Sequence, residues 1–179
     1  FMGSTAAVLS APVIIPASAL GADGTVAPSN RINLGLIGTG NMGKRHLPRI
    51  LGDRSVQLLA ICDPDAIRLN ETREIVELNY AQDLPKGTYN GCAAVADFNE
   101  ILQRKDIDAV LNITPDHWHV PITIATARAG KDIYCEKPIS MTVRQGRRLV
   151  EEVQKHDCIF QTGTQYRSKT VIRKALTYV

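Results

Sequence analysis

The sequence I-N-L-G-L-I-G-T-G-N-M-G, from Ile32 to Gly43, decides the fold of this 179-residue chain. It joins a short apolar strand to a loop of the form G-x-G-x-x-G, whose glycines are Gly38, Gly40 and Gly43. In a nucleotide-binding α/β unit the first glycine makes a tight turn, the second lets the backbone approach a pyrophosphate, and the third lets the next helix pack closely. The N-terminal N–H groups of that helix bind the phosphates. Alone the loop is a weak motif, and a strand-to-helix turn without a ligand is the alternative.

A carboxylate stands where a dinucleotide site requires one. The apolar run Val56–Cys62 is typical of a strand buried on both faces of a parallel sheet. It ends in Asp63, twenty residues after Gly43, where an acid accepts hydrogen bonds from the adenosine ribose. The alternative for Asp63 is the N-cap of the next helix, because Pro64 follows it. Asp63 favours NAD, since a carboxylate repels a 2′-phosphate, while Arg68 about one turn later leaves NADP possible.

Strands and helices alternate along the rest of the chain. Further strands are predicted at 93–96, 108–114, 132–135 and 158–162, and helices from the glycine loop to Gly52 and at 65–79, 97–103, 120–129 and 142–156. This order predicts a doubly wound, mainly parallel Rossmann sheet. Pro48 should bend or shorten the first helix. In the last helix Val143, Leu149, Val150 and Val153 should face the sheet, with arginines and glutamates outside.

Composition narrows the class of protein. Hydrophobic residues make up 44% and charged residues 22%, as in an ordinary globular domain. A net charge of +3 is too small to indicate a nucleic acid or an anionic membrane as partner, and aromatic residues, at 5%, are too few for a base-stacking surface. The four cysteines, Cys62, Cys92, Cys135 and Cys158, form no C-x-x-C pair, so buried free thiols are expected.

Residues 1–30 differ from the rest, because Asp23 is their only charged side chain. An apolar segment followed by Ala17-Ser18-Ala19 is typical of a secretory leader with an A-x-A cleavage site. The apolar run is too short and too interrupted by proline to span a membrane. We therefore expect a periplasmic or otherwise exported protein, and a cytoplasmic one if this segment is only a disordered tail.

Two polar clusters follow predicted strands. Thr114–His119 (T-P-D-H-W-H) comes after the fourth strand and Glu136–Pro138 (E-K-P) after the fifth. Such sheets bind ligands at the carboxyl ends of their strands, so both clusters should border the nicotinamide end of a cofactor. No third ligand is spaced to join the histidines of the first cluster, so no metal site is predicted. Between an acid and a proline, Lys137 should be partly desolvated, which would lower its pKa and suit it to polarising a hydroxyl; a solvated surface charge is the alternative.

The motifs G-T-G-N-M-G, T-P-D-H-W-H, C-E-K-P and Q-T-G-T-Q-Y-R together resemble the nucleotide-binding half of the Gfo/Idh/MocA oxidoreductases, over about residues 31–167. With the leader, T-P-D-H-W-H further resembles an exported bacterial subgroup. The resemblance implies hydride transfer between NAD, or possibly NADP, and a hydroxyl of a sugar, polyol or glycoside. The alternatives are an NAD-dependent glycoside hydrolase or lyase of the same family and a non-catalytic sensor with a nucleotide fold.

The resemblance also implies residue roles. The family's E-K-P motif makes Lys137 the catalytic residue, which binds the substrate hydroxyl and whose bond to Pro138 is often cis. In the family's T-P-N-x-x-H pattern Asp116 replaces asparagine, which puts an amide-specific contact there in doubt. The predicted cofactor-binding residues are Gly38, Thr39, Gly40, Asn41, Met42, Gly43, Asp63, Thr114, Pro115, His119, Glu136 and Lys137, and the substrate candidates are Asp116, His117, Trp118 and Arg167.

Domain organisation follows from the same comparison. Residues 1–30 would be leader and linker, 31–163 the Rossmann domain, and 164–179 the start of a connection to a second, C-terminal α/β domain. In the family that domain supplies a catalytic His, or an Asp and a His, and the surface through which homo-oligomers form. No residue of this chain can be assigned those roles.

Overall fold

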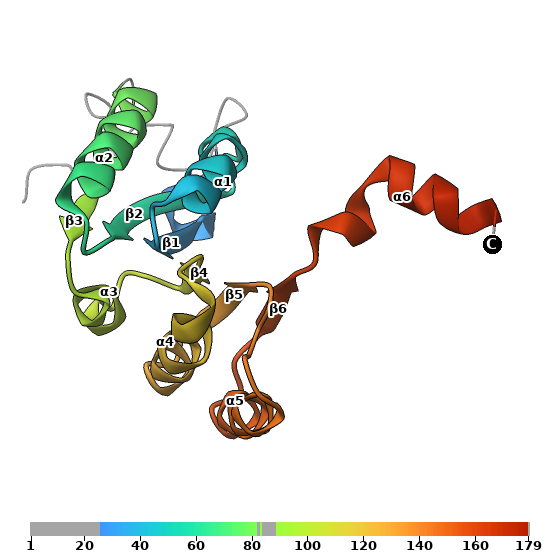
Figure 1. Ribbon diagram of the computed structural model, residues 1–179. Helices are drawn as coiled ribbons and strands as arrows, with labels where there is room; N and C mark the ends of the chain where they lie inside the picture. The colour runs from blue at the N-terminus through green and yellow to red at the C-terminus, as the bar shows by residue number, and fades with distance from the viewer. Residues whose placement is uncertain (1–25, 82, 84–88, 179) are drawn as a thin grey trace, which may run out of the picture.

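The chain forms a six-stranded parallel sheet with helices on both faces (Figure 1). This computed structural model describes residues 26–81, 83 and 89–178, so most of the predicted leader lies outside the described residues. The sheet has the order β3-β2-β1-β4-β5-β6, which confirms the doubly wound prediction. Its strands are β1 (Ile32–Ile37), β2 (Val56–Cys62), β3 (Ala93–Val95), β4 (Ala109–Asn112), β5 (Asp132–Glu136) and β6 (Phe160–Gly163).

Two layers of helices cover the sheet. Helices α1 (Asn41–Gly52) and α2 (Ala66–Tyr80) cover one face, and α3 (Phe98–Gln103), α4 (Asp116–Arg128) and α5 (Val143–Lys155) cover the other (Figure 1). Leu47, Ile50 and Val76 pack on Leu36 and Leu58 in the first layer. On the second face Ile101 and Ile122 pack on Val110. Strand order reverses between β1 and β4, which is where sheets of this kind bind nucleotides.

Helix α4 differs most from its prediction. It begins at Asp116, four residues before the predicted start, so Asp116–His119 of the T-P-D-H-W-H cluster form its first turn. Pro115 stands at the N-cap, and Asp116 lies in the first turn, where the helix dipole stabilises an acid. Pro121 lies inside α4. Gly130, with φ +70°, follows the helix in the left-handed conformation expected after a C-cap.

Helix α5 corrects another expectation. Thr142 caps its N-terminus by accepting a hydrogen bond from the Gln145 N–H, and Leu149 is buried, as predicted. Val143 is 84% exposed and Val150 43% exposed, so neither faces the sheet. The helix instead turns Glu152 towards α4. The spacing of apolar residues did not predict this orientation of Glu152, because the sequence does not show that Arg128 on the neighbouring helix is its partner.

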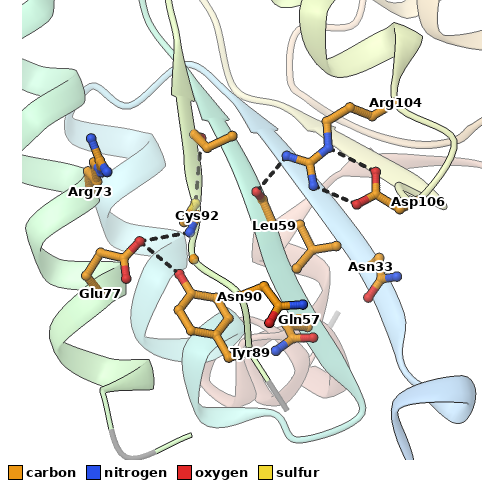
Figure 2. A pocket seen from close by; sticks show the side chains of 12 residues that line it. Asn33, Gln57, Leu59, Arg73, Glu77, Tyr89, Asn90, Cys92, Arg104 and Asp106 are labelled. Atoms are coloured by element: carbon orange, nitrogen blue, oxygen red, sulfur yellow. Dashed lines mark hydrogen bonds and ion pairs between the residues drawn. The ribbon is translucent and has the colours of Figure 1, made fainter. Parts of the chain in front are cut away.

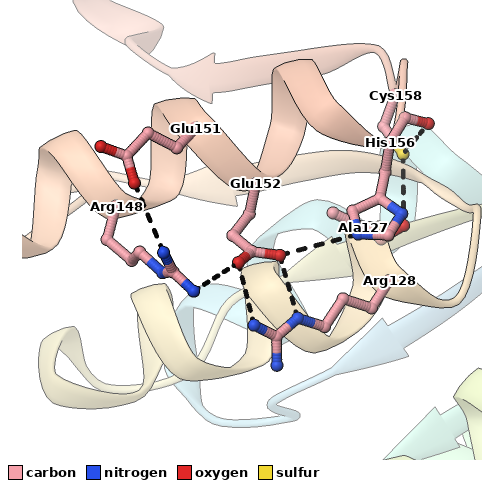
Figure 3. Close-up of polar contacts among 7 residues, drawn as sticks. All are labelled: Ala127, Arg128, Arg148, Glu151, Glu152, His156 and Cys158. Carbon is pink, nitrogen blue, oxygen red and sulfur yellow. Dashed lines mark hydrogen bonds and ion pairs between the residues drawn. The ribbon is translucent and has the colours of Figure 1, made fainter.

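Glu152 is the centre of an ion network between α4 and α5 (Figure 3). Its side chain is 3% exposed and accepts two hydrogen bonds from Arg128, both at 2.9 Å. It also forms an ion pair with Arg148 at 2.8 Å. His156 Nε2 lies 3.6 Å from the same carboxylate. The hydrogen bonds from Arg128 lower the pKa of Glu152 to about 2. The prediction that the glutamates of α5 lie outside is therefore wrong for this residue.

The cysteines and the segment after β6 complete the described structure. Cys62, Cys92 and Cys135 are buried free thiols, as expected, and Cys158 is a partly exposed one. After β6 the chain forms η3 (Gln165–Ser168), α6 (Thr170–Ala175) and η4 (Leu176–Tyr178), which extend away from the sheet (Figure 1). Within the described residues no helix combines the length and the apolarity that crossing a membrane requires.

Candidate cofactor site

At Gly38 and Gly43 the glycine loop has the tight turn and the close helix packing that the motif predicts. Gly38 has φ +95°, and a Cβ atom there would lie 2.4 Å from the Ile113 carbonyl oxygen of the adjacent strand end. A Cβ atom at Gly43 would lie 2.2 Å from the Gly38 carbonyl oxygen. Any side chain at either position would collide with backbone, so both glycines are required for the turn and for the close packing of α1.

Gly40 is different, because the protein itself leaves room there. A Cβ atom at Gly40 would meet only the Arg68 Nη1 atom, at 3.9 Å. Gly40 is also the N-cap of α1, and it provides no side chain to bind the helix N–H groups. An open approach to uncapped N–H groups is what a pyrophosphate needs. The loop therefore fits the phosphates of a dinucleotide.

Asp63 holds the glycine loop to the end of β2. Its Oδ2 atom accepts hydrogen bonds from the backbone N–H of Thr39 at 2.8 Å and from the Thr39 hydroxyl at 3.0 Å. Its Oδ1 atom accepts one from the Asp65 N–H at 3.0 Å. Asp65, rather than Asp63, is the N-cap of α2, so the alternative role for Asp63 is wrong. The carboxylate is nearly buried but still borders the cavity described next.

A cavity of about 660 Å³ opens at the carboxyl edge of the sheet. It runs from the glycine loop past the ends of β2 and β3 to the first turn of α4. Among the predicted cofactor and substrate residues, those that line it are Gly38, Gly40, Asn41, Met42, Asp63, Thr114, Pro115, His117 and Trp118. Arg68 and Phe98 line it too. Thr39, Gly43, His119, Glu136, Lys137, Asp116 and Arg167 do not line it.

His119 lies behind the cavity wall, where it connects the two polar clusters. The ring is 1% exposed. Its Nε2 atom lies 2.8 Å from the Thr114 carbonyl oxygen and its Nδ1 atom 2.6 Å from the Pro138 carbonyl oxygen. Both partners are carbonyl oxygens, which accept hydrogen bonds and cannot donate them. A hydrogen bond to either one therefore has the imidazole N–H as its donor. This geometry fixes the E-K-P turn relative to the start of α4 and gives His119 a positioning role.

Lys137 lies beyond this wall, at the end of β5. Its peptide bond to Pro138 is cis, as the resemblance implies. Its side chain is exposed, so the described residues do not provide the desolvation that the sequence suggested. Its ammonium group has no hydrogen-bond partner among the described residues and is accessible to a ligand that reaches this edge.

Glu136 anchors the turn that carries Lys137. The Glu136 side chain is nearly buried, and its Oε2 atom accepts a hydrogen bond from the Lys137 backbone N–H at 3.1 Å. Its Oε1 atom accepts from Tyr134 at 3.2 Å and lies 2.9 Å from His46 Nε2, and the Gln165 amide donates to the same atom. Burial, with the nearby Glu136 charge as a second cause, raises the pKa of Tyr134 to about 12.

Sequence reasoning missed several residues of this region. His46 on α1 and Gln165 after β6 contact Glu136 from 90 and 29 positions away along the chain. Gln165 belongs to the Q-T-G-T-Q-Y-R motif, which was the one available indication. Gly163 in that motif leaves room for the cluster, because a Cβ atom there would lie 2.6 Å from the Tyr134 hydroxyl. No motif in the sequence around His46 indicated that it contacts this site.

A second cavity, of about 530 Å³, lies at the opposite, amino edge of the sheet (Figure 2). Glu77, Arg104 and Asp106 in its wall all have partners within the protein. Arg104 binds Asp106 through two hydrogen bonds and the Leu59 carbonyl through a third, and Glu77 accepts from Tyr89 and from the Cys92 N–H. Such pairing indicates a structural role. No group of three or more His, Cys, Asp or Glu side chains in the described part of the chain is placed to hold a metal ion.

Comparison with known proteins shows the family to which this chain belongs. The model of the oxidoreductase family with an NAD-binding Rossmann fold, GFO_IDH_MocA, matches residues 32–164. A "Glycosyl hydrolase family 109 protein" of Shewanella pealeana is 31% identical over 155 residues, which are 84% of this chain and 33% of the relative. An "Alpha-N-acetylgalactosaminidase" of Shewanella oneidensis is 30% identical, also over 84% of this chain and 33% of the relative. The chain thus spans about a third of the length of these curated relatives.

Solved structures agree with the family match. A "probable dehydrogenase" from Thermotoga maritima superposes with a TM-score of 0.64 and 30% identity, over 74% of this chain and 36% of the other. The scyllo-inositol dehydrogenase of Lactobacillus casei, solved with NAD(H) and scyllo-inositol, gives a TM-score of 0.68 and 25% identity over 81% of this chain and 39% of the other. With its glycine loop, Asp63 and E-K-P turn on one sheet edge, this chain belongs to the Gfo/Idh/MocA family of NAD(P)-binding oxidoreductases.

Proposed function

We propose that the protein is an NAD(P)-dependent oxidoreductase that acts on a hydroxyl group of a sugar, polyol or glycoside. One observation carries the proposal: the open backbone at Gly40 and the accessible ammonium group of Lys137 both belong to the carboxyl edge of one parallel sheet. The first fits a pyrophosphate, and the second suits a hydroxyl that has to lose its proton. The scyllo-inositol dehydrogenase among the structural neighbours acts on such a hydroxyl and supports this choice of substrate class.

The residues divide the work between binding and reaction. The uncapped N-terminus of α1 would hold the pyrophosphate, and Asp63 would accept hydrogen bonds from the adenosine ribose. Bound nicotinamide supplies a hydride acceptor or donor. Lys137 would donate a hydrogen bond to the reacting hydroxyl and lower its pKa, because a nearby cation stabilises an alkoxide. We further propose that the proton acceptor belongs to a second domain of the kind found in the family.

The proposed cofactor is NAD, although Arg68 makes NADP a serious competitor. The Asp63 carboxylate repels a 2′-phosphate, but the Arg68 guanidinium lines the same cavity and stands close to Gly40. Arg68 is also paired with Asp65, with Nε and Oδ2 3.2 Å apart, which offsets part of its charge. Titrating the protein separately with NAD and NADP in a calorimeter compares the two cofactors directly. We expect NAD to bind more tightly.

Gly40→Ala tests the cofactor site without disturbing the fold. The new methyl group meets only the end of the flexible Arg68 side chain, so the unfolding free energy should stay within about 0.5 kcal/mol of wild type. The same methyl group stands where a pyrophosphate would approach, so NAD affinity should fall at least about tenfold. Gly52→Ala is the matched control, because nothing lies within 4 Å of a Cβ atom there. Unchanged NAD binding by Gly40→Ala would refute the proposed site.

Lys137→Ala tests the reaction. In the complete protein, followed by the absorbance of reduced nicotinamide with sugars, polyols and glycosides as substrates, this variant should lose about 10²–10⁴-fold in turnover. NAD affinity should change much less, because Lys137 does not line the cofactor cavity. Turnover equal to wild type would contradict the proposed role of Lys137.

A second candidate is an NAD-dependent glycoside hydrolase that oxidises and then re-reduces its substrate. The names of the two Shewanella relatives, a family 109 glycosyl hydrolase and an α-N-acetylgalactosaminidase, favour it. The same residues would bind the cofactor and the sugar hydroxyl. Release of a free sugar from a glycoside without net formation of NADH would support the hydrolase, and stoichiometric NADH would support the dehydrogenase.

A further inference from the structure

We propose that Trp118 is the stacking surface for the adenine ring of the cofactor and is not a substrate contact. This inference rests on the proposed function, because it takes the large cavity as the dinucleotide site. The sequence placed Trp118 among the substrate candidates, near the nicotinamide end. The surroundings of its indole ring indicate the other end of the dinucleotide.

The position of Trp118 in the cavity carries the first step. Trp118 lines the same cavity as Asp63, Pro64 and Arg68, which follow β2, and Phe98, which follows β3. In sheets of this topology the acid after β2 marks the adenosine half of the dinucleotide. Lys137, where the reacting hydroxyl is expected, follows β5 and does not line this cavity. The indole therefore belongs to the adenosine half.

The exposure and chemistry of the ring carry the second step. Trp118 is 46% exposed, although apolar residues such as Ile113 and Ile122 line the same cavity. A large aromatic ring at the mouth of a partly apolar cavity offers a flat surface to a planar base. Every base has a π-face, so stacking on an indole needs no particular hydrogen bonds. The early start of α4 at Asp116 gives the indole a helical backbone to support it.

Phe98 and His117 hold the indole in place. The Phe98 and Trp118 ring centroids are 6.3 Å apart with a 60° tilt, and those of His117 and Trp118 are 6.2 Å apart with a 47° tilt. A base sandwiched between two rings needs parallel faces about 7 Å apart, which is twice the usual contact distance between carbon atoms. Neither pair meets that requirement. Phe98 and His117 therefore buttress Trp118, and the base stacks on the exposed part of the indole.

The chain contains a single tryptophan, and the fluorescence that wild type has and Trp118→Phe lacks reports on this site alone. We expect ADP-ribose, which has the adenine but no nicotinamide, to quench Trp118 fluorescence to the same extent as NAD. Nicotinamide mononucleotide, which lacks the adenine, should leave the fluorescence unchanged. Quenching by nicotinamide mononucleotide or by a sugar, with none by ADP-ribose, would overturn the inference and return Trp118 to the substrate side.

Variants provide the energetic test. Trp118→Leu should weaken ADP-ribose binding roughly tenfold, as measured by calorimetry, while Trp118→Phe retains most of the affinity because it keeps a stacking face. Tyr166→Leu is the matched control, since Tyr166 is an exposed aromatic residue outside the cavity. Equal ADP-ribose affinity in wild type and Trp118→Leu would overturn the inference. If wild type binds NAD but Trp118→Leu loses nothing, only this inference fails; if wild type binds neither NAD nor ADP-ribose, the proposed function fails as well.

Discussion

His46 on α1 lies 2.9 Å from Glu136 at the end of β5, through its Nε2 atom and the Oε1 atom of the carboxylate. This contact joins the helix that begins at the glycine loop to the turn that carries Lys137. The two residues are 90 positions apart in the sequence. The cofactor loop and the proposed reactive lysine are thus held to one another by a buried carboxylate as well as by the sheet.

Replacing the Glu136 carboxylate tests this connection. Glu136→Gln puts an amide N–H₂ group among groups that donate hydrogen bonds to the carboxylate, so at least one partly buried donor loses its acceptor. The free energy of unfolding of the variant, measured by urea titration, should be about 1–3 kcal/mol lower than that of wild type. Glu100→Gln is a suitable control, since Glu100 is exposed and its change should stay within about 0.5 kcal/mol. Equal losses in the two variants would show that the cluster around Glu136 does not stabilise the fold.

The glycines of the loop should differ from one another in their effect on stability. Gly38→Ala requires a non-glycine residue at φ +95° and brings a methyl group against the Ile113 carbonyl, so it should cost about 1–3 kcal/mol or more. Gly52→Ala, at the end of α1, should instead stabilise by about 0.5–1 kcal/mol because alanine has less freedom in the unfolded chain. Urea titrations of the two variants measure both effects. A Gly38→Ala variant as stable as wild type would disprove the strained turn.

The sequence predicted well whatever depends on spacing along one stretch of chain. The glycine loop, the buried strand Val56–Cys62 and the acid after it lie within about thirty residues, and each has a local physical requirement. The alternation of strands and helices was enough to predict a doubly wound, mainly parallel sheet. The parallel pairing itself needs no further information, because crossover helices leave few other arrangements.

What escaped the sequence depends on partners distant in the chain. Glu152 looked like a surface residue of α5 because Arg128 on α4 cannot be recognised as its partner from spacing. The placement of His119 behind the cavity wall depends on Pro138, 19 positions later. The start of α4 was predicted four residues late, because the polar stretch Asp116–His119 has no apolar periodicity and Pro115 at the N-cap provides no capping side chain.

His119 should matter for stability far more than its neighbour His117. His119→Ala leaves the carbonyl oxygens of Thr114 and Pro138 without the imidazole and opens a cavity where the buried ring was, so it should cost about 2 kcal/mol or more. His117 is exposed, and His117→Ala should change the unfolding free energy by less than about 0.5 kcal/mol. Because His119 fixes the E-K-P turn, its loss should also reduce turnover of the complete protein. Similar stabilities of the two variants in urea would contradict the positioning role.

The Glu152 network should make stability depend on acid pH. Hydrogen bonds from Arg128 lower the pKa of Glu152 from 4.5 to about 2, so the folded state favours the ionised carboxylate. A depressed pKa contributes stability that is fully present above the ordinary value and is lost as pH falls from about 4.5 towards 2. Glu152→Gln removes this contribution, so it should lower the melting temperature at pH 7 and have a smaller effect at pH 3.

Glu151→Gln is the matched control for this series. The Glu151 side chain is 65% exposed, and its one ion pair, with Arg148, is long at 3.5 Å. Its melting temperature should follow wild type at both pH values, since exposed pairs contribute little. The decisive quantity is the difference in melting temperature between wild type and Glu152→Gln. If that difference does not shrink between pH 7 and pH 3, the ionised carboxylate of Glu152 does not stabilise the packing of α4 on α5.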